Sequence, residues 1–158
     1  MRLGLIADTH GKVRAEVHEI FRRVDLILHA GDLGGADVLE ELELLGKVVA
    51  VYGNVDTAIM KRRLPQVAKI EVDDLRFVIT HGDQLGSREP EAIKEAFPDA
   101  DVIVFGHTHK ALIHNFPDFS IVINPGAAGP GRFDLKPSVA ILETEPGLPP
   151  RARIVELK

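Results

Sequence analysis

Seven side chains of the types that bind metal ions come shortly after apolar runs in this sequence. Residues 5–7 and 102–105, for example, are apolar and are followed at once by an aspartate or histidine block. The seven are Asp8, His10, Asp32, Asn54, His81, His107 and His109. Successive blocks are 22 to 27 residues apart, about the length of a strand with its connection. Because open α/β sheets bind ligands outside the carboxyl ends of their strands, we expect the seven to meet at one edge.

Seven nitrogen and oxygen ligands exceed what one ion needs and suit two. A set that mixes histidine with aspartate and asparagine favours Mn, Fe, Co, Ni or Zn over Mg or Ca, which prefer oxygen ligands alone. Asp32 lies in the middle of the set, and its two carboxylate oxygens make it the candidate bridge between the ions. Two divalent ions outweigh the charges of Asp8, Asp32 and a bridging hydroxide. The site therefore favours an anion attacked by that hydroxide, as in phosphatases and nucleases.

Apolar runs that alternate with amphipathic segments predict the elements that position these ligands. In the first half we expect strands at 3–7, 25–30 and 47–52, with helices at about 13–23 and 36–45 between them. This β-α-β-α-β order predicts right-handed crossovers and a parallel sheet. In the second half we expect hairpins over 67–80 and 111–124, a helix at 89–97, and strands at 101–105, 139–144 and 153–157. The pattern predicts an α/β protein, mostly antiparallel in its second half, with two facing sheets covered by helices.

Five short blocks occur in an order that resembles the signature of the calcineurin-like metallophosphoesterase superfamily. They are Asp8-x-His10, Gly31-Asp32, Gly53-Asn54, His81-Gly82 and Gly106-His107-x-His109. The short chain and its Asn124-Pro125-Gly126 loop are similar to the small bacterial and archaeal phosphodiesterases of this superfamily, which are related to Vps29. The resemblance implies a four-layer α-β-β-α sandwich with two mixed sheets and a dinuclear metal site at the C-terminal edge of the strands.

The resemblance also implies how the ligands divide between two divalent ions. The first ion would be held by Asp8, His10, Asp32 and His109, and the second by Asp32, Asn54, His81 and His107. Asn54 would also hold a phosphoryl oxygen. The implied activity is hydrolysis of phosphate esters, with phosphodiesters favoured; the alternatives are a phosphomonoesterase and a Vps29-like interaction scaffold with a vestigial site. Because all seven ligand positions are present, we favour the enzyme.

Two positions depart from the superfamily pattern. Many members carry a histidine after the asparagine of the third block, where it is credited with protonating the leaving group, but this sequence has Val55. Many members also have histidine after His81-Gly82, where this sequence has Asp83. Valine cannot transfer a proton, so we predict modest turnover and faster hydrolysis of esters whose leaving group needs no proton. We interpret Asp56 and Asp83 as partners that orient a ligand histidine.

Other polar residues have less specific signals. His29 lies inside an apolar run just before the second block and is interpreted as a buried, hydrogen-bonded histidine that can support the site. His18 and His114 are interpreted as surface or structural residues. Arg132 lies in the Gly-rich segment 124–133, which is either a compact turn or a wall that brings this arginine to the substrate phosphate. The basic run 61–63 is interpreted as a surface cluster.

Composition excludes several classes of protein. The 158 residues fit one domain over 1–158, and the absence of cysteine excludes thiolate metal sites, iron–sulfur clusters and disulfides. No apolar run approaches the ~20 residues of a membrane span, and the N-terminal apolar stretch is too short for a secretory signal, so we expect a cytoplasmic protein. With 19 basic and 24 acidic residues, strong nucleic-acid binding is not expected, whereas a phosphate-ester small molecule or a nucleotide suits the local site. The family tie allows a homo-oligomer, which no sequence feature requires.

Overall fold

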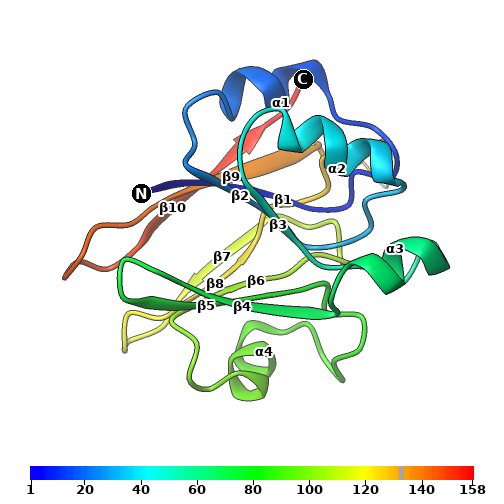
Figure 1. Ribbon diagram of the computed structural model, residues 1–158. Helices are drawn as coiled ribbons and strands as arrows, with labels where there is room; N and C mark the ends of the chain where they lie inside the picture. The colour runs from blue at the N-terminus through cyan, green and yellow to red at the C-terminus, as the bar shows by residue number, and fades with distance from the viewer. Residues whose placement is uncertain (132–133) are drawn as a thin grey trace.

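Two five-stranded sheets face each other in the computed structural model, which describes residues 1–131 and 134–158 (Figure 1). The first sheet has the strand order β10-β9-β1-β2-β3, and the second has the order β4-β5-β6-β8-β7. Helices α1 and α2 lie outside the first sheet, and α4 lies outside the second. The layers therefore run helix, sheet, sheet, helix, which confirms the predicted α-β-β-α sandwich with two mixed sheets.

The first sheet combines segments from both ends of the sequence. Its strands are β1 (Arg2–Ile6), β2 (Leu26–His29), β3 (Val48–Ala50), β9 (Ser138–Glu143) and β10 (Arg151–Glu156). β1, β2 and β3 are parallel, with Leu5 opposite Leu28 and Leu28 opposite Val49. β9 pairs antiparallel with the other side of β1, and β10 forms a hairpin with β9. β1 is therefore the central strand of this sheet.

The second sheet is mixed, as predicted, and it has a parallel centre that the sequence pattern does not indicate. Its strands are β4 (Val67–Val72), β5 (Leu75–Thr80), β6 (Val102–Val104), β7 (Leu112–Asn115) and β8 (Ile121–Asn124). The expected hairpins β4–β5 and β7–β8 form its two edges, but β5, β6 and β8 are parallel. Because β7 takes the edge position, β8 returns beside β6 in the same direction. Three carboxyl strand ends thus point to one edge.

The helices of the described chain are short: α1 (Ala15–Ile20), α2 (Ala36–Glu43), α3 (Ala58–Arg63) and α4 (Pro90–Ala96). The sequence pattern does not predict α3, because Met60 is the buried residue of this helix and one position sets no apolar period. Thr57 caps α3 by accepting a hydrogen bond from the Met60 N–H at 3.3 Å. Across residues 1–131 and 134–158, no helix has the length and apolar character that a membrane span requires.

Three apolar layers hold the sandwich together. Leu5 and Ile79 belong to the layer between the two sheets. Phe21 packs between the first sheet and its helices, and Ile93 packs between α4 and the second sheet. Successive residues of β1 enter different layers, since Leu5 faces the second sheet while Ile6 packs under the helices. A strand that is buried on both faces reads as a continuous apolar run, as this one does.

Candidate metal centre

The seven predicted ligand residues lie in loops at the carboxyl ends of strands from both sheets. The strand that each follows is β1 for Asp8 and His10, β2 for Asp32, β3 for Asn54, β5 for His81, and β6 for His107 and His109. The first sheet therefore contributes two carboxylates, one amide and one imidazole, and the second contributes three imidazoles.

Five of the seven residues have left-handed backbone conformations. The φ angles are 53° at Asp8, 47° at His10, 57° at Asp32, 71° at His107 and 63° at His109. This conformation costs a residue with a Cβ about 1 to 2 kcal/mol, so it persists only where the surrounding contacts fix it. Such backbone strain is common at functional sites in proteins, and five of the nine described non-glycine residues with this conformation are predicted ligands.

Asp8, His10 and His109 form the first of two groups whose ligand atoms converge. His10 Nε2 lies 3.4 Å from His109 Nε2. Asp8 Oδ1 lies 3.4 Å from His109 Nε2 and 3.7 Å from His10 Nε2. Ligand atoms bound at about 2.1 Å around a tetrahedral ion stand roughly 3.4 Å apart, so the spacing of this group fits a metal ion.

The second group joins Asp8 to Asp32 and His81. His81 Nε2 lies 3.1 Å from Asp32 Oδ2 and 3.9 Å from Asp8 Oδ1. Asn54 Oδ1 lies 3.0 Å from His81 Nε2, which adds the predicted amide ligand. Asp32 Oδ2 is also 3.9 Å from His10 Nε2. Each carboxylate therefore lies near imidazoles of both groups. That Asp32 bridges two metal ions stays a prediction.

The Asp8 carboxylate has the properties of a group that binds a cation. Its Oδ2 accepts a hydrogen bond from the His107 N–H at 3.1 Å, but its buried Oδ1 has no hydrogen-bond partner within the described chain. A buried carboxylate oxygen without a partner is costly unless a cation meets it. Burial raises the pKa of this carboxyl, but His10 and His109 outweigh burial and hold the pKa well below its usual range.

Asp32 and His81 stabilise each other's charge. Burial lowers the pKa of His81, but the carboxylates of Asp32 and Asp8 outweigh it, and the pKa is raised. Burial likewise raises the pKa of Asp32, and the contact with His81 reverses this to a lowered pKa. His81 Nδ1 donates a hydrogen bond to Ala30 O at 2.8 Å, so Nε2 is the nitrogen that faces the carboxylates. Fixing one ring nitrogen in this way is how proteins orient a metal-binding histidine.

His107 is half-buried and belongs to neither group of converging ligand atoms. Its ring centroid is 5.2 Å from that of His81, in an edge-to-face arrangement. Burial lowers the pKa of His107, and the positive charges of His81 and Arg88 act in the same direction. The resulting neutral imidazole is the form that coordinates metals.

Asp56 holds the backbone of two ligand loops, which corrects the expectation that it orients a ligand histidine. Its buried carboxylate accepts hydrogen bonds from the N–H groups of Gly53 at 2.8 Å, Asp32 at 3.0 Å and Gly34 at 3.1 Å. Asp32 Oδ1 accepts a further hydrogen bond from the Val55 N–H at 3.0 Å. Position 53 requires glycine, because a Cβ there would overlap the Asp32 carboxylate. Asp56 therefore fixes the loops after β2 and β3 to each other.

His29 connects the loop after β1 to the loop after β2. Its Nδ1 accepts a hydrogen bond from the Gly31 N–H at 3.1 Å, so Nε2 carries the proton and donates to Thr9 Oγ1 at 3.0 Å. Thr9 Oγ1 donates onward to Leu33 O at 2.8 Å. Burial lowers the pKa of His29 to about 3, and its neutral state preserves the acceptor nitrogen.

Asp83 and Arg132 are the two remaining residues that the sequence associates with the site. Asp83 is half-buried, and within the described ranges no hydrogen bond or ion pair joins it to a ligand histidine. Arg132 lies outside the described residues. The segment before it packs against the first ligand loop, where the Gly129 N–H donates to Asp8 O at 3.1 Å. A Cβ at position 129 would overlap the Thr9 carbonyl, so this close approach requires glycine.

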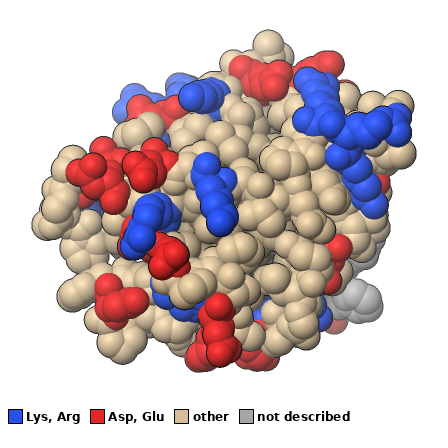
Figure 2. Space-filling model, turned by 60° about the horizontal axis from the view of Figure 1, so that its bottom comes forward, with Lys and Arg blue, Asp and Glu red and all other residues tan. Residues whose placement is uncertain are grey.

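The basic run 61–63 forms the last turn of α3 and is attached to a ligand loop. Lys61 Nζ donates a hydrogen bond to Asn54 O at 3.3 Å and lies 5.9 Å from the ring centroid of Tyr52. In Figure 2, Lys and Arg side chains gather at the right edge of the face, on the side where α3 lies in Figure 1. A positive surface thus adjoins the third ligand block.

His18 and His114 have their contacts elsewhere. His18 Nε2 lies 2.7 Å from Glu41 Oε1 and joins α1 to α2 at the surface. His114 lies on the edge strand β7, and its ring packs edge-to-face on Phe116 with centroids 4.6 Å apart. Neither contact involves a predicted ligand.

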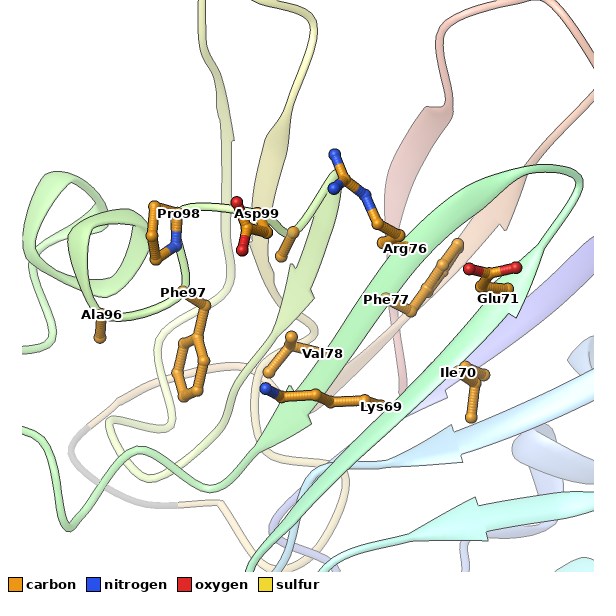
Figure 3. A pocket seen from close by; sticks show the side chains of 11 residues that line it. Lys69, Ile70, Glu71, Arg76, Phe77, Val78, Ala96, Phe97, Pro98 and Asp99 are labelled. Carbon is orange, nitrogen blue, oxygen red and sulfur yellow. The ribbon is translucent and has the colours of Figure 1, made fainter.

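A cavity of about 390 Å³ lies at the other end of the second sheet (Figure 3). Phe97, Val78 and Lys69 lie around it, between the end of α4 and strands β4 and β5. Arg76, near the start of β5, also lines the cavity, whereas His81 follows the end of the same strand. The length of β5 therefore separates this cavity from the ligand cluster.

A four-layer sandwich with aspartate, asparagine and histidine at its strand ends defines the class of metallophosphoesterases. Residues 1–147 match the Calcineurin-like phosphoesterase superfamily domain, and the chain belongs to this superfamily. It is 35% identical over 152 residues to a probable metallophosphoesterase of Methanothermobacter thermautotrophicus. The alignment covers 92% of this chain and 87% of the relative. It is 33% identical over 162 residues to a phosphodiesterase of Methanocaldococcus jannaschii, with 92% and 94% of the two chains covered.

Solved structures show the same fold. An archaeal phosphodiesterase superposes with a TM-score of 0.78 and 29% identity over 99% of this chain and 100% of the other. Vps29 of Entamoeba histolytica, in a complex with zinc, superposes with a TM-score of 0.79 and 23% identity over 99% of both chains. At that identity the likeness to Vps29 shows the fold alone.

Proposed function

We propose that this protein hydrolyses phosphate esters, preferably phosphodiesters, with two divalent ions held by the seven predicted ligands. The observation that carries the proposal is the convergence of two groups of ligand atoms on Asp8, whose buried Oδ1 has no partner in the described chain. Relatives named metallophosphoesterase and phosphodiesterase support the same reaction class. A scaffold has no need to keep all seven ligand positions, which favours the enzyme over the Vps29-like alternative.

The residues of the centre have distinct roles in this proposal. Asp8 and Asp32 hold the ions with negative charge, and the imidazoles add neutral ligands. Bound divalent ions supply positive charge opposite a phosphate and lower the pKa of water, so that hydroxide is available near neutral pH. Asn54 is an exposed residue of the candidate centre, so its amide can hold a phosphoryl oxygen of the substrate. His29 and Asp56 keep the ligand loops in place through their hydrogen bonds.

The presence of Val55 allows a specific prediction about which leaving groups are hydrolysed fastest. Val55 is 57% exposed and directly follows Asn54, at the position where the superfamily pattern expects a proton donor. A leaving group that receives no proton departs as an anion, so the rate depends steeply on its pKa. Aryl esters with acidic phenols are therefore the expected good substrates.

A leaving-group series tests the proposed function. Metal-free protein is prepared by dialysis, Mn, Ni, Co, Fe or Zn is added back, and methyl aryl phosphodiesters with phenols of different pKa are assayed beside the matching aryl monoesters. We expect metal-dependent hydrolysis, faster for diesters, with kcat/KM falling as the pKa of the phenol rises. Val55→His should flatten that dependence and raise the rate on the poorest leaving group about tenfold or more.

Three outcomes contradict the proposal at different levels. No hydrolysis with any metal, together with no bound metal by elemental analysis, overturns the enzyme function. If monoesters are hydrolysed faster than diesters, the protein is a phosphomonoesterase and the preference for phosphodiesters is wrong. A rate that does not vary with the pKa of the phenol contradicts the assignment of Val55.

A further inference from the structure

A groove of about 650 Å³ opens beside the candidate metal centre. Two loops line it, residues 86–90 on one side and residues from 105–112 on the other. The first loop follows His81, and the second contains His107 and His109 between its lining residues. Its volume is in the range of small-molecule sites.

Arg88 links the groove to the centre. Its Cγ lies 3.8 Å from the place that a Cβ of Gly82 would take, next to His81. Arg88 Nη1 donates a hydrogen bond to Leu85 O at 2.7 Å, which orients the guanidinium. Within the described residues no carboxylate forms an ion pair with Arg88, and its side chain lines the groove. The guanidinium is therefore available to an anion near the centre.

Lys110 supplies a second cation from the opposite loop. The Lys110 N–H donates to Thr108 Oγ1 at 3.2 Å, and Asn124 Nδ2 donates to the same oxygen at 3.0 Å. Asn124 Nδ2 also donates to Gly106 O at 3.0 Å, which anchors the loop to the end of β8. The loop that presents Lys110 is thus fixed by hydrogen bonds at its base, while the lysine itself is exposed.

The lining of the groove combines positive charge with apolar surface. The described lining residues include two cations and one carboxylate, Glu89, and Pro90 and Leu112 contribute apolar surface. A ligand that matches this lining has an anionic group and a flat or apolar body. A nucleoside that carries a phosphate has both, and Arg and Lys are the residues that bind phosphate most often.

We propose that this groove binds a second phosphate of the substrate through Arg88 and Lys110, so that preferred substrates are nucleotide phosphodiesters with a further phosphate. This inference rests on the proposed phosphodiesterase function. The second phosphate does not react. In the hydrolysis, the oxygen of a water molecule would bond to the reacting phosphorus and lose a proton to solvent, the bond from that phosphorus to the leaving oxygen would break, and the distal phosphate would stay attached to its nucleoside.

A matched pair of substrates tests the groove. The first is the p-nitrophenyl ester of thymidine 5′-phosphate, and the second is the same ester with an additional 3′-phosphate. We expect the wild type to prefer the second substrate about tenfold in kcat/KM, mainly through KM, because charge-assisted hydrogen bonds contribute on this scale. Lys110→Gln and Arg88→Gln should each reduce the preference ratio, and Lys110→Glu should bring it to one or below.

The ratio separates this inference from the proposed function. Arg151→Gln, a change on β10 beside Glu143, is the matched control and should leave the preference as in the wild type. Equal kcat/KM for both esters in an active wild type overturns the groove assignment and leaves the phosphodiesterase standing. A preference that survives Lys110→Glu overturns it as well. Failure of the wild type to hydrolyse any aryl phosphodiester overturns both.

Discussion

The two sheets contribute different chemistry to the candidate centre. The first sheet supplies the buried carboxylates Asp8 and Asp32, and the backbone behind them is held by Asp56 and His29. The second sheet supplies imidazoles only, and His107 among them is only half-buried. Desolvating an ionised carboxylate costs far more than desolvating a neutral imidazole. The hydrogen bonds of Asp56 and His29 therefore support the half of the centre that carries the negative charge.

Loss of a carboxylate is the largest expected effect. Asp32→Ala should release metal from both sites and reduce kcat/KM by well over the roughly 100-fold that loss of a supporting group costs. Metal per protein from elemental analysis and kcat/KM on an aryl phosphodiester measure it. Asp8→Ala is the matched comparison, because Asp8 Oδ1 belongs to both ligand groups. Retained activity in Asp32→Ala, with the loss confined to Asp8→Ala, would refute Asp32 as the bridge.

Loss of a peripheral imidazole should be smaller and reversible. His107→Ala leaves a gap at a half-exposed position, which free imidazole in the buffer can enter. We expect kcat/KM to fall about 100-fold and to recover partly with added imidazole, since one ligand of one ion is missing. The same addition to Asp32→Ala should restore nothing. Equal rescue of the two variants would contradict the contrast between the sheets.

Removal of backbone support should have an intermediate effect. Asp56→Asn replaces an acceptor oxygen by a donor that faces N–H groups, so the loops after β2 and β3 lose part of their connection. We expect metal affinity to fall about 10- to 100-fold, measured by titration of the metal-free protein. Asp83→Asn is the control, and its metal affinity should change less than threefold. A larger loss in the Asp83 variant would reverse the roles assigned to the two aspartates.

The smallest expected effect is on stability and concerns His29. Its folded pKa of about 3 lies below the unfolded value near 6.5, so the unfolded chain binds more protons between these pH values. The stability that neutral His29 gives is present above pH 6.5 and is lost as the pH falls toward 3. From pH 7 to pH 5 the free energy of unfolding should drop by about 2 kcal/mol through this residue.

Urea unfolding of metal-free wild type and His29→Gln at pH 7, 6 and 5 measures the effect. The raised pKa of His81 acts in the opposite direction, but it is common to both proteins and cancels in the difference. The gap between the two unfolding free energies should therefore narrow as the pH falls. A constant gap would show that His29 is not buried as the neutral form.

The sequence predicts the elements and ligands that follow directly from local patterns. Each ligand block stands behind an apolar run, and in the structure each lies at the carboxyl end of a strand. The sequence does not predict helix α3, because a short capped helix with one buried side chain, Met60, gives no periodic apolar pattern. The parallel pairing of β6 with β8 was missed because it depends on which hairpin strand takes the edge. Neither a short capped helix nor the order of strands within a sheet is encoded in a local apolar pattern.

Contacts made by backbone groups were equally inaccessible to sequence reasoning. The sequence predicts that Asp56 contacts a histidine, but its partners are backbone N–H groups, which do not depend on residue type. A sequence signal did exist, since Asp56 follows the third block by two residues and an acidic side chain there can fold back on the turn. The groove with Arg88 and Lys110 brings together two loops whose proximity only the sheet order reveals.

The central position of β1 has a consequence for how the chain folds. β1 pairs on one side with β2, which follows soon after it in the sequence. On its other side β1 pairs with β9, which lies far along the chain, with Gly4 opposite Ile141. The Ala128 N–H also donates to Ala7 O, just before Asp8. Pairings over such separations are entropically costly to close and slow folding. During synthesis, the loop that carries Asp8 and His10 therefore gains its full set of neighbours only after residues 128–143 have been made, so we expect these two predicted ligands to reach their final positions late in folding.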